Sequence, residues 1–335
     1  IAQIGLQGKV FKYFAKIIND DNLAFQWLHI ICSVQLAIVL VVIIYFVEKK
    51  YNMIMASCFY AVFLLSPWIV NFARNLYWVE FTWFFPMLVG LVCSIFIEHK
   101  YIRRCCYVGA YITILIKCLC GYEYITTVMM GLIVFLCADF FESLLKKKKD
   151  EIILLGRTIL IIGSLALLAF ATAISLHAML RGNGNILSGI RSIIEQDVLR
   201  RTLGGNANNY AAVFADSLNA SIGQVLCKYY NFQTDIITFI PGKAFPWISG
   251  IPFILWIIDK CNDKKVDMTE ILLYALFWLT SVSWFVLGKA HSYIHTHMNF
   301  VLWYFGYVQI CLYIICVHII KYSKKVSERY KKMRR

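Results

Sequence analysis

The segment from Ala24 to Val47 reads AFQWLHIICSVQLAIVLVVIIYFV and contains no charged residue. A transmembrane helix needs roughly 20 mostly apolar residues, so this segment is long enough to cross a bilayer. Sixty per cent of the 335 residues are hydrophobic, 16% are charged and the mean hydropathy is +0.67. A soluble domain carries about 25% charged residues. The composition therefore indicates a membrane protein with several spans.

Further apolar segments follow this one, and together they predict an all-α, polytopic bundle of about nine transmembrane helices with helical outer-face loops. Only helices and closed barrels satisfy the backbone hydrogen bonds in lipid, and long uniform apolar runs lack the alternation of barrel strands. No repeat or linker divides the chain, so residues 1–335 are expected to form a single integral membrane domain. The predicted spans are Ala24–Val47, Met53–Val70, Phe81–Ile97, Cys105–Cys120, Tyr124–Phe141, Thr158–Met179, Phe245–Ile258, Ile271–Leu287 and Phe300–Ile320.

The distribution of lysine and arginine predicts how the chain is threaded. Most of the 33 basic residues fall in alternate loops near Lys49, Lys100, Lys146 and Lys260 and in the basic tail 321–335. The positive-inside rule assigns these loops and the C-terminus to the cytoplasm. The low-complexity basic loops and the lack of a recognisable targeting signal favour a bacterial plasma membrane. The net charge of +14 is then a topology signal, and no nucleic-acid partner is expected.

The same threading puts residues 1–23 on the outer side, although no segment among them could carry the chain across. Because the chain begins at Ile1, we expect another transmembrane helix to precede it. Residues 1–19 carry apolar side chains on a helical period, which predicts an amphipathic helix on the membrane surface. A packed loop helix is the alternative. Asp20 and Asp21 follow as a candidate base or cation ligand, and the alternative is that Asp21-Asn22 is the N-cap of the first span.

The long outer loop 180–243 is expected to be helical. Glycine-rich turns flank a predicted helix Ile186–Leu203, and Tyr210–Lys228 predicts a second helix. The first of these helices carries Arg200 and Arg201. Arginine binds phosphate in a bidentate manner, so both are candidate phosphate ligands, with a solvated surface as the alternative.

Three shorter outer segments carry the other candidate site residues. Glu80 lies at the start of a span, shortly after Arg74. A charge at the edge of the bilayer costs free energy unless it is paired with an opposite charge or hydrated. Lys117 lies inside a span and Glu123 lies in the tight turn that follows. Lys117 either extends its ammonium group outward to the membrane surface, pairs with Glu123 or binds an anionic ligand. In the stretch GKAHSYIHTHMN at 288–299, a cation and several directed hydrogen-bond donors suit a phosphate or sugar. Those residues are Lys289, His291, Tyr293 and His295.

A metal site is not expected from the histidines. His291 and His295 have the i, i+4 spacing of a metal pair, but no acid accompanies them as in HExxH. The aromatic residues Tyr77, Trp78 and Trp83 are expected to be anchors at the membrane interface.

This arrangement resembles the GT-C superfamily of polytopic membrane glycosyltransferases, and in particular the protein-mannosyl and lipid A aminoarabinosyl transferases. The resemblance covers the layout of the chain and three short stretches: the surface segment 1–23, the stretch from Ser66-Pro67 to Glu80, and the last outer loop, Lys289–Asn299. It implies transfer of a sugar from a polyprenyl-phosphate donor to a glycan, lipid or protein acceptor on the outer face.

The resemblance also implies roles for the candidate residues. Glu80, with Asp20, Asp21 or an acid outside this sequence, would activate the acceptor, and Arg74 would orient Glu80. The donor phosphate would be held by Lys289, His291, His295, Arg200 and Arg201. Some members of the superfamily use a divalent cation, which leaves the cofactor open. Two alternatives remain: a polysaccharide polymerase or ligase of the O-antigen type, and a transporter or flippase without chemistry.

Overall fold

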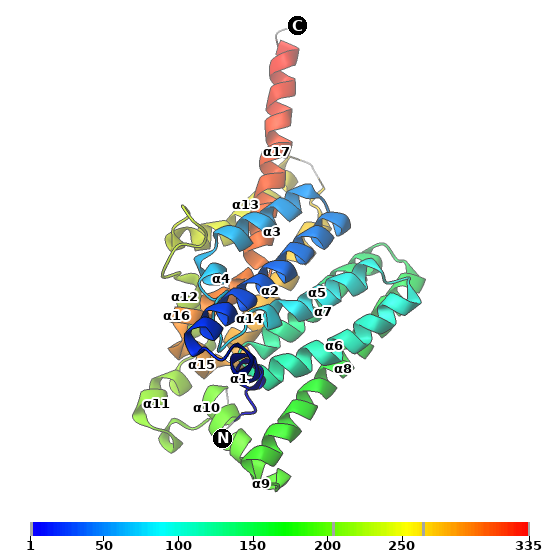
Figure 1. Cartoon of the computed structure of the whole chain (residues 1–335). Helices are drawn as coiled ribbons and strands as arrows, with labels where there is room; N and C mark the ends of the chain where they lie inside the picture. Colours follow the sequence, from blue (N-terminus) through cyan, green and yellow to red (C-terminus); the bar gives the residue numbers. More distant parts are fainter. Residues whose placement is uncertain (1–2, 203–204, 263–264, 334–335) are drawn as a thin grey trace.

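The computed structural model of the chain describes residues 3–202, 205–262 and 265–333, and within these ranges the regular elements are all helices (Figure 1). The all-α prediction is therefore confirmed. Five helices of the described chain are long and apolar enough to cross a membrane. They are α2 (Asp21–Lys50), α7 (Ile125–Leu145), α8 (Lys149–Arg181), the segment Gly242–Cys261 that contains α13 (Phe245–Cys261), and α14 (Met268–Leu287).

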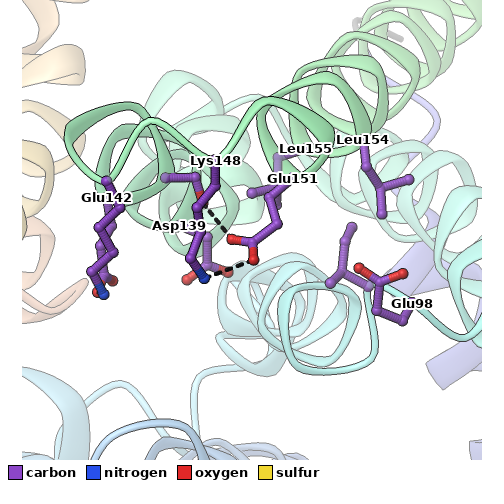
Figure 2. A pocket seen from close by; sticks show the side chains of 10 residues that line it. Glu98, Asp139, Glu142, Lys148, Glu151, Leu154 and Leu155 are labelled. Carbon is purple, nitrogen blue, oxygen red and sulfur yellow. Dashed lines mark hydrogen bonds and ion pairs between the residues drawn. The ribbon is translucent and has the colours of Figure 1, made fainter.

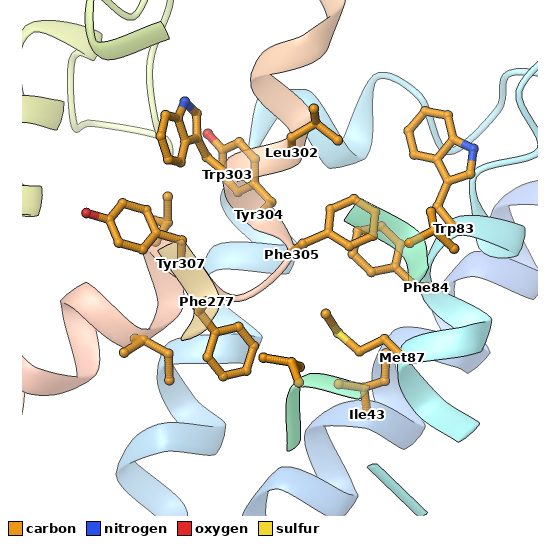
Figure 3. Close-up of a cluster of buried hydrophobic side chains, with 14 of the residues drawn as sticks. Ile43, Trp83, Phe84, Met87, Phe277, Leu302, Trp303, Tyr304, Phe305 and Tyr307 are labelled. Atoms are coloured by element: carbon orange, nitrogen blue, oxygen red, sulfur yellow. The ribbon is translucent and has the colours of Figure 1, made fainter. Parts of the chain in front are cut away.

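A sixth crossing is formed if two bent helical pieces count as one span. The pieces are Thr296–Tyr304 and Tyr307–Lys324, and they meet at an angle of 48°. Gly306 lies at the bend with a φ of +107°, and a Cβ there would lie 2.1 Å from Cδ1 of Phe277. Only glycine combines this backbone conformation with this close approach. Figure 3 shows Phe277 and Phe305 at the bend, in the buried core beside Phe84.

The predicted count of about nine spans is not confirmed. The second predicted span is broken, because α3 (Met53–Leu65) ends at Ser66 and the short α4 (Pro67–Val70) begins there. The Ser66 hydroxyl accepts hydrogen bonds from the backbone N–H groups of the first turn of α4, and a proline suits a first turn. The helix α5 (Phe81–Ile95) has only 15 residues, and α6 (Lys100–Cys120) carries basic residues at both ends.

The segments predicted to lie outside gather at one end of the bundle. That end holds α1 (Leu6–Ile18), α9 (Ile186–Ile193), α11 (Ala212–Asn219) and α15 (Lys289–Ile294) (Figure 1). At the other end, α17 (Tyr307–Met333) projects from the bundle. The two ends thus differ as the threading predicts, and we refer to the first as the α15 end. A cytoplasmic C-terminus remains a prediction.

The outer loop is helical, but its helices are shorter than predicted. In place of one helix over 186–203, α9 continues through the π-helical turn η1 (Ile194–Val198) into α10 (Leu199–Arg201). Leu203 and Gly204, at the end of that prediction, lie outside the described residues. The second predicted helix is divided into α11 and α12 (Ile222–Tyr230), because Ser221 forms a capping box with Gln224 that begins a new helix.

Candidate functional site

A cavity of about 530 Å³ lies at the α15 end of the bundle. Its walls come from segments that are far apart in the sequence: the loop before α5, the turn between α6 and α7, α10, α11, and residues 291–298. Five of the predicted site residues line it, namely Glu123, Arg200, Arg201, His291 and His295. The other lining residues are Tyr77, Trp78, Phe214, Ile294, His297 and Met298.

The Glu123 carboxylate is buried in the tight turn between α6 and α7. It lies so close to the backbone of Gly121 that a Cβ at position 121 would be 2.4 Å from Oε2 of Glu123. Lys117 is also buried, and its Nζ donates a 2.7 Å hydrogen bond to the carbonyl oxygen of Gly121. Lys117 does not line the cavity, so its visible role is to hold the turn that presents Glu123.

Asp197 brings the arginines of the outer loop together. Its carboxylate lies 2.5 Å from Nη2 of Arg181, 3.3 Å from Nη2 of Arg201 and 4.0 Å from Nη2 of Arg200. The guanidinium group of Arg200 also lies over the ring of Phe214, 5.1 Å from its centroid. Three positive charges surround one negative charge, so this group, which we call the arginine cluster, retains a positive excess beside the cavity.

The histidine rings of the cavity lie against one another in tilted and edge-on arrangements. The ring centroids of His291 and His295 are 4.4 Å apart, and those of His295 and His297 are 5.6 Å apart. Burial, together with the neighbouring histidines and arginines, lowers the pKa of His291 to about 3. Burial also lowers the pKa of His295. Both rings are therefore neutral at physiological pH, and they suit hydrogen bonding to uncharged hydroxyl groups better than pairing with a phosphate.

The described residues offer no metal site. No group of three or more His, Cys, Asp and Glu side chains among them is placed to hold a metal ion. The donor set of the cavity therefore does not fit the divalent cation that the resemblance leaves open, and no step below is routed through one.

Glu80 is buried behind the cavity and does not line it. It is 1% exposed, and neither of its carboxylate oxygens has a hydrogen-bond partner among the described residues. Burial raises its pKa well above the ordinary value. Arg74 is exposed, so the predicted pairing of Arg74 with Glu80 is wrong. A tightly packed helix start without a cation nearby leaves Glu80 in its neutral form.

Four other predicted site residues do not line the cavity. Asp20 accepts a 3.0 Å hydrogen bond from the backbone N–H of Leu23 as the N-cap of α2, one residue before the cap predicted at Asp21-Asn22, and Asp21 lies in the exposed first turn. The Nζ of Lys289 donates two 2.6 Å hydrogen bonds, to the carbonyl oxygens of Leu218 and Ala220. The ring of Tyr293 lies under the ammonium group of Lys228, which is 3.4 Å from its centroid.

A smaller apolar pocket of about 130 Å³ adjoins the cavity. Its apolar wall comes from α7, α8, the outer loop and α14, through Ile125, Phe170, Ile174, Ile193 and Trp284. Arg181, Asp197 and Arg201 line its polar rim. Among the described residues, Arg201 alone lines both the polar cavity and this pocket. A ligand with an anionic group between a polar part and an apolar part fits this arrangement.

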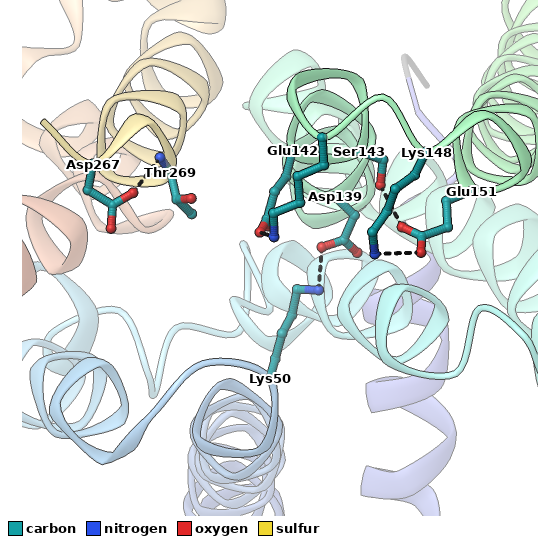
Figure 4. Close-up of polar contacts among 9 residues, drawn as sticks. Lys50, Asp139, Glu142, Ser143, Lys148, Glu151, Asp267 and Thr269 are labelled. Carbon is teal, nitrogen blue, oxygen red and sulfur yellow. Dashed lines mark hydrogen bonds and ion pairs between the residues drawn. The ribbon is translucent and has the colours of Figure 1, made fainter. Parts of the chain in front are cut away.

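A third cavity, of about 290 Å³, lies at the opposite end of the bundle (Figure 2). Its lining residues include four acids and two lysines, so it has no excess of positive charge for a phosphate. Lys148 Nζ lies 2.7 Å from Oε1 of Glu151, the Ser143 hydroxyl donates a hydrogen bond to Oε2 of Glu151, and Lys50 pairs with Asp139 at 2.5 Å (Figure 4). The cavity at the α15 end is therefore the stronger candidate site.

The sequence interpretation missed Asp197, Phe214 and His297 as members of the site. Asp197 precedes Arg200 and Arg201 by three and four residues, the spacing of side chains that meet on one helical face, and this was the available signal. Trp78 was assigned to the membrane interface, whereas it lines the cavity. No local sequence pattern predicts that Phe214 lines the cavity, because its position depends on how α11 packs against α10.

Comparison with protein-family models, curated proteins and solved structures finds no match for this chain. The arguments on function that follow therefore depend on the geometry of the cavity.

Proposed function

We propose that this protein is a membrane glycosyltransferase that moves a sugar from a polyprenyl-phosphate donor to a hydroxyl group of a glycan, lipid or protein acceptor. The observation that carries the proposal is the convergence of Glu123, the arginine cluster and aromatic rings in one cavity beside an apolar pocket. Such a site offers a carboxylate base, a phosphate ligand and a place for an apolar chain at once. Several apolar helices that could span a membrane give the protein access to a lipid-linked donor.

The donor phosphate is assigned to Arg200 and Arg201. Guanidinium groups bind phosphate oxygens through paired, charge-assisted hydrogen bonds. With the phosphate at Arg201, the polyprenyl chain extends into the apolar pocket along Ile125 and Phe170, and the sugar extends into the polar cavity. The exposed ring of Tyr77 and the ring of Trp78 form the wall where an acceptor enters.

The proposed reaction is a displacement at the anomeric carbon of the sugar. Glu123 removes the proton of the acceptor hydroxyl, and the acceptor oxygen forms a bond to the anomeric carbon. The bond from that carbon to the phosphate oxygen breaks, and the leaving phosphate keeps the electron pair. The positive excess of the arginine cluster stabilises the charge that develops on the leaving group. Neutral His291 and His295 hydrogen-bond the sugar hydroxyls and help to fix its orientation.

Donor turnover by the full chain in membranes tests this assignment. A correctly placed general base contributes about 10²- to 10⁴-fold, so Glu123→Gln should lower kcat by at least about 100-fold while donor binding is retained. Glu195→Gln is the matched control, because Glu195 is an exposed outer-loop acid that pairs with Arg191 and does not line the cavity. Full turnover by Glu123→Gln would remove Glu123 from the mechanism.

A further inference from the structure

A layer of buried polar side chains lies behind the cavity, around the ring of Tyr124. We call it the inner layer, and its members besides Tyr124 are Glu80, Trp83, Trp284, His291 and Asn299. Each of the six is at most 8% exposed. They come from the starts of α5 and α7, the end of α14, α15 and α16 (Thr296–Asn299).

Contacts between the rings show that the inner layer is continuous. The ring centroid of Tyr124 is 4.9 Å from that of Trp83 and 5.9 Å from that of Trp284, and Trp284 lies 5.6 Å from His291. The Tyr124 hydroxyl donates a 2.8 Å hydrogen bond to Oδ1 of Asn299. The backbone N–H of Trp83 donates a 2.9 Å hydrogen bond to the carbonyl oxygen of Glu80, which places the buried acid one turn before Trp83, beside the same layer.

Most of the polar atoms of the inner layer have no hydrogen-bond partner among the described residues. These atoms are Oε1 and Oε2 of Glu80, Nε1 of Trp83, Nε1 of Trp284, Nδ1 of His291 and Nδ2 of Asn299. A buried polar group without a partner costs about 1–3 kcal/mol, and native proteins contain few of them. Their concentration in one layer next to a cavity therefore indicates groups that are kept for a ligand.

The inner layer borders both candidate ligand spaces. His291 belongs to it and also lines the polar cavity, and Trp284 belongs to it and also lines the apolar pocket. The ring of Trp78, in the cavity wall, lies 6.5 Å from that of Trp83. A ligand held by Arg201, where the two spaces meet, would thus have its polar part directed towards the inner layer.

We propose that the inner layer is the binding subsite for the uncharged, hydroxyl-rich ring of the donor sugar. The two indole N–H groups and the Asn299 amide supply donors for sugar oxygens, and the Glu80 carboxyl and the His291 ring supply acceptors for sugar hydroxyls. The aromatic faces of Trp83, Tyr124 and Trp284 supply the apolar surface that such sites combine with a few convergent polar groups. The subsite is free of lysine and arginine, which places charge recognition at the arginine cluster instead.

This inference rests on the proposed function, and it adds a specific consequence. A site with buried groups that hydrogen-bond a ligand hydroxyl discriminates strongly against a ligand without it, because those groups are then left unpaired. The inner layer should therefore make the sugar a large contributor to donor affinity. A phosphate-binding site without such a subsite would bind polyprenyl phosphate with or without a sugar equally well.

Binding of lipids to the purified full chain in detergent, followed by native mass spectrometry, tests the subsite. The probes are polyprenyl phosphate and polyprenyl phosphates that carry glucose, mannose or N-acetylglucosamine. The wild-type protein should bind at least one sugar-bearing lipid at least 10-fold more tightly than the sugar-free lipid. Trp284→Phe, which keeps a ring in the wall of the apolar pocket but removes the N–H, should abolish most of this preference. Asn299→Ala should do the same, and because Asn299 lines neither the cavity nor the apolar pocket, it should leave affinity for the sugar-free lipid within 2-fold.

Trp278→Phe is the matched control, because Trp278 lies on the same helix and its Nε1 donates to the Tyr230 hydroxyl, away from the inner layer. It should keep the wild-type preference. If polyprenyl phosphate binds but no sugar increases its affinity, the subsite is refuted while the phosphate site stands. A preference that survives unchanged in Trp284→Phe and Asn299→Ala also refutes it. If none of the lipids binds, the proposed function fails and the subsite fails with it.

Discussion

Nη2 of Arg201 lies 3.3 Å from Oδ1 of Asp197, and the other oxygen of the same carboxylate lies 2.5 Å from Nη2 of Arg181. Asp197 sits in the π-helical turn η1, which interrupts the regular winding between α9 and α10. Such turns are rare and are often found at functional sites. The turn and the ion pairs together fix Arg201 at the boundary between the polar cavity and the apolar pocket. We therefore regard Asp197 as a positioning residue for the phosphate site.

Asp197→Asn should weaken donor binding without a comparable loss in the chemical step. Partly exposed ion pairs contribute up to about 1 kcal/mol, so KM for the donor should rise about 5-fold while kcat changes less than 2-fold. Steady-state kinetics in membranes would measure both constants. Glu195→Gln should leave them unchanged. A fall in kcat at constant KM would show that Asp197 acts on the reacting groups rather than on donor binding.

Gly121→Ala should displace the Glu123 carboxylate. The new Cβ would lie 2.4 Å from Oε2 of Glu123, closer than van der Waals contact allows, so the side chain must move out of its place in the cavity wall. We expect kcat to fall about 10- to 100-fold, because misplacement of a catalytic group by about 1 Å has effects of this size. Gly163→Ala on α8 meets nothing within 4 Å and should retain activity. Equal activity of the two variants would contradict the placement of Glu123.

The stability of the protein should depend on pH through Glu80. Burial raises the pKa of Glu80 in the folded state, so above its ordinary value of 4.5 the unfolded chain releases a proton that the folded chain keeps. The contribution of Glu80 to the free energy of unfolding is therefore fully present below pH 4.5. It is lost as the pH rises towards the pKa of Glu80 in the folded protein. Glu80→Gln does not titrate. Its melting temperature relative to that of the wild type should therefore increase between pH 4.5 and 8.

Differential scanning fluorimetry in detergent would measure this difference at each pH. Glu98→Gln, which changes an exposed acid at the other end of the bundle, should show no such trend. A wild-type protein that gains stability relative to Glu80→Gln as the pH rises would show that Glu80 is charged and paired in the folded state.

Lys289→Met should destabilise the outer loop and leave phosphate binding intact. The ammonium group of Lys289 is buried, and it donates to two backbone carbonyls at the end of α11. Hydrogen bonds to a charged group contribute about 1.5–3 kcal/mol, so the melting temperature should fall by several degrees. Lys243→Met changes an exposed lysine of the same loop and should have little effect. Loss of donor affinity at an unchanged melting temperature would instead support the phosphate-ligand role predicted from the sequence.

The helical nature of the chain follows from its sequence because composition alone excludes other folds. The uncharged stretch from Ala24 to Val47 is helical throughout, within α2. The breaks were harder to predict. Ser66 and Pro67 stop a helix by local capping, and the bend at Gly306 depends on how closely Phe277 approaches, which is a tertiary contact. Apolar periodicity reports neither effect, and the predicted count of about nine spans is not confirmed.

The sequence predicted which residue types form the site, but it did not predict which of those side chains contact one another. Glu123, Arg200 and His291 were selected as charged or polar residues at helix ends, and the fold brings them to one cavity. The sequence could not show that Lys289 donates hydrogen bonds to backbone carbonyls at the end of α11, or that Arg74 is exposed while Glu80 is buried. Whether a polar side chain faces a ligand space or a backbone carbonyl depends on packing between distant segments, and no local pattern encodes it.

Binding of polyprenyl phosphate to the purified full chain tests the central claim most directly. The double variant Arg200→Ala/Arg201→Ala removes two charge-assisted ligands and should bind the lipid at least about 100-fold more weakly than the wild type. Arg191→Ala is the matched control, because Arg191 is 82% exposed on the same outer loop and pairs only with Glu195 among the described contacts. The account predicts wild-type affinity for Arg191→Ala. Equal affinity of the double variant, the control and the wild type would contradict it.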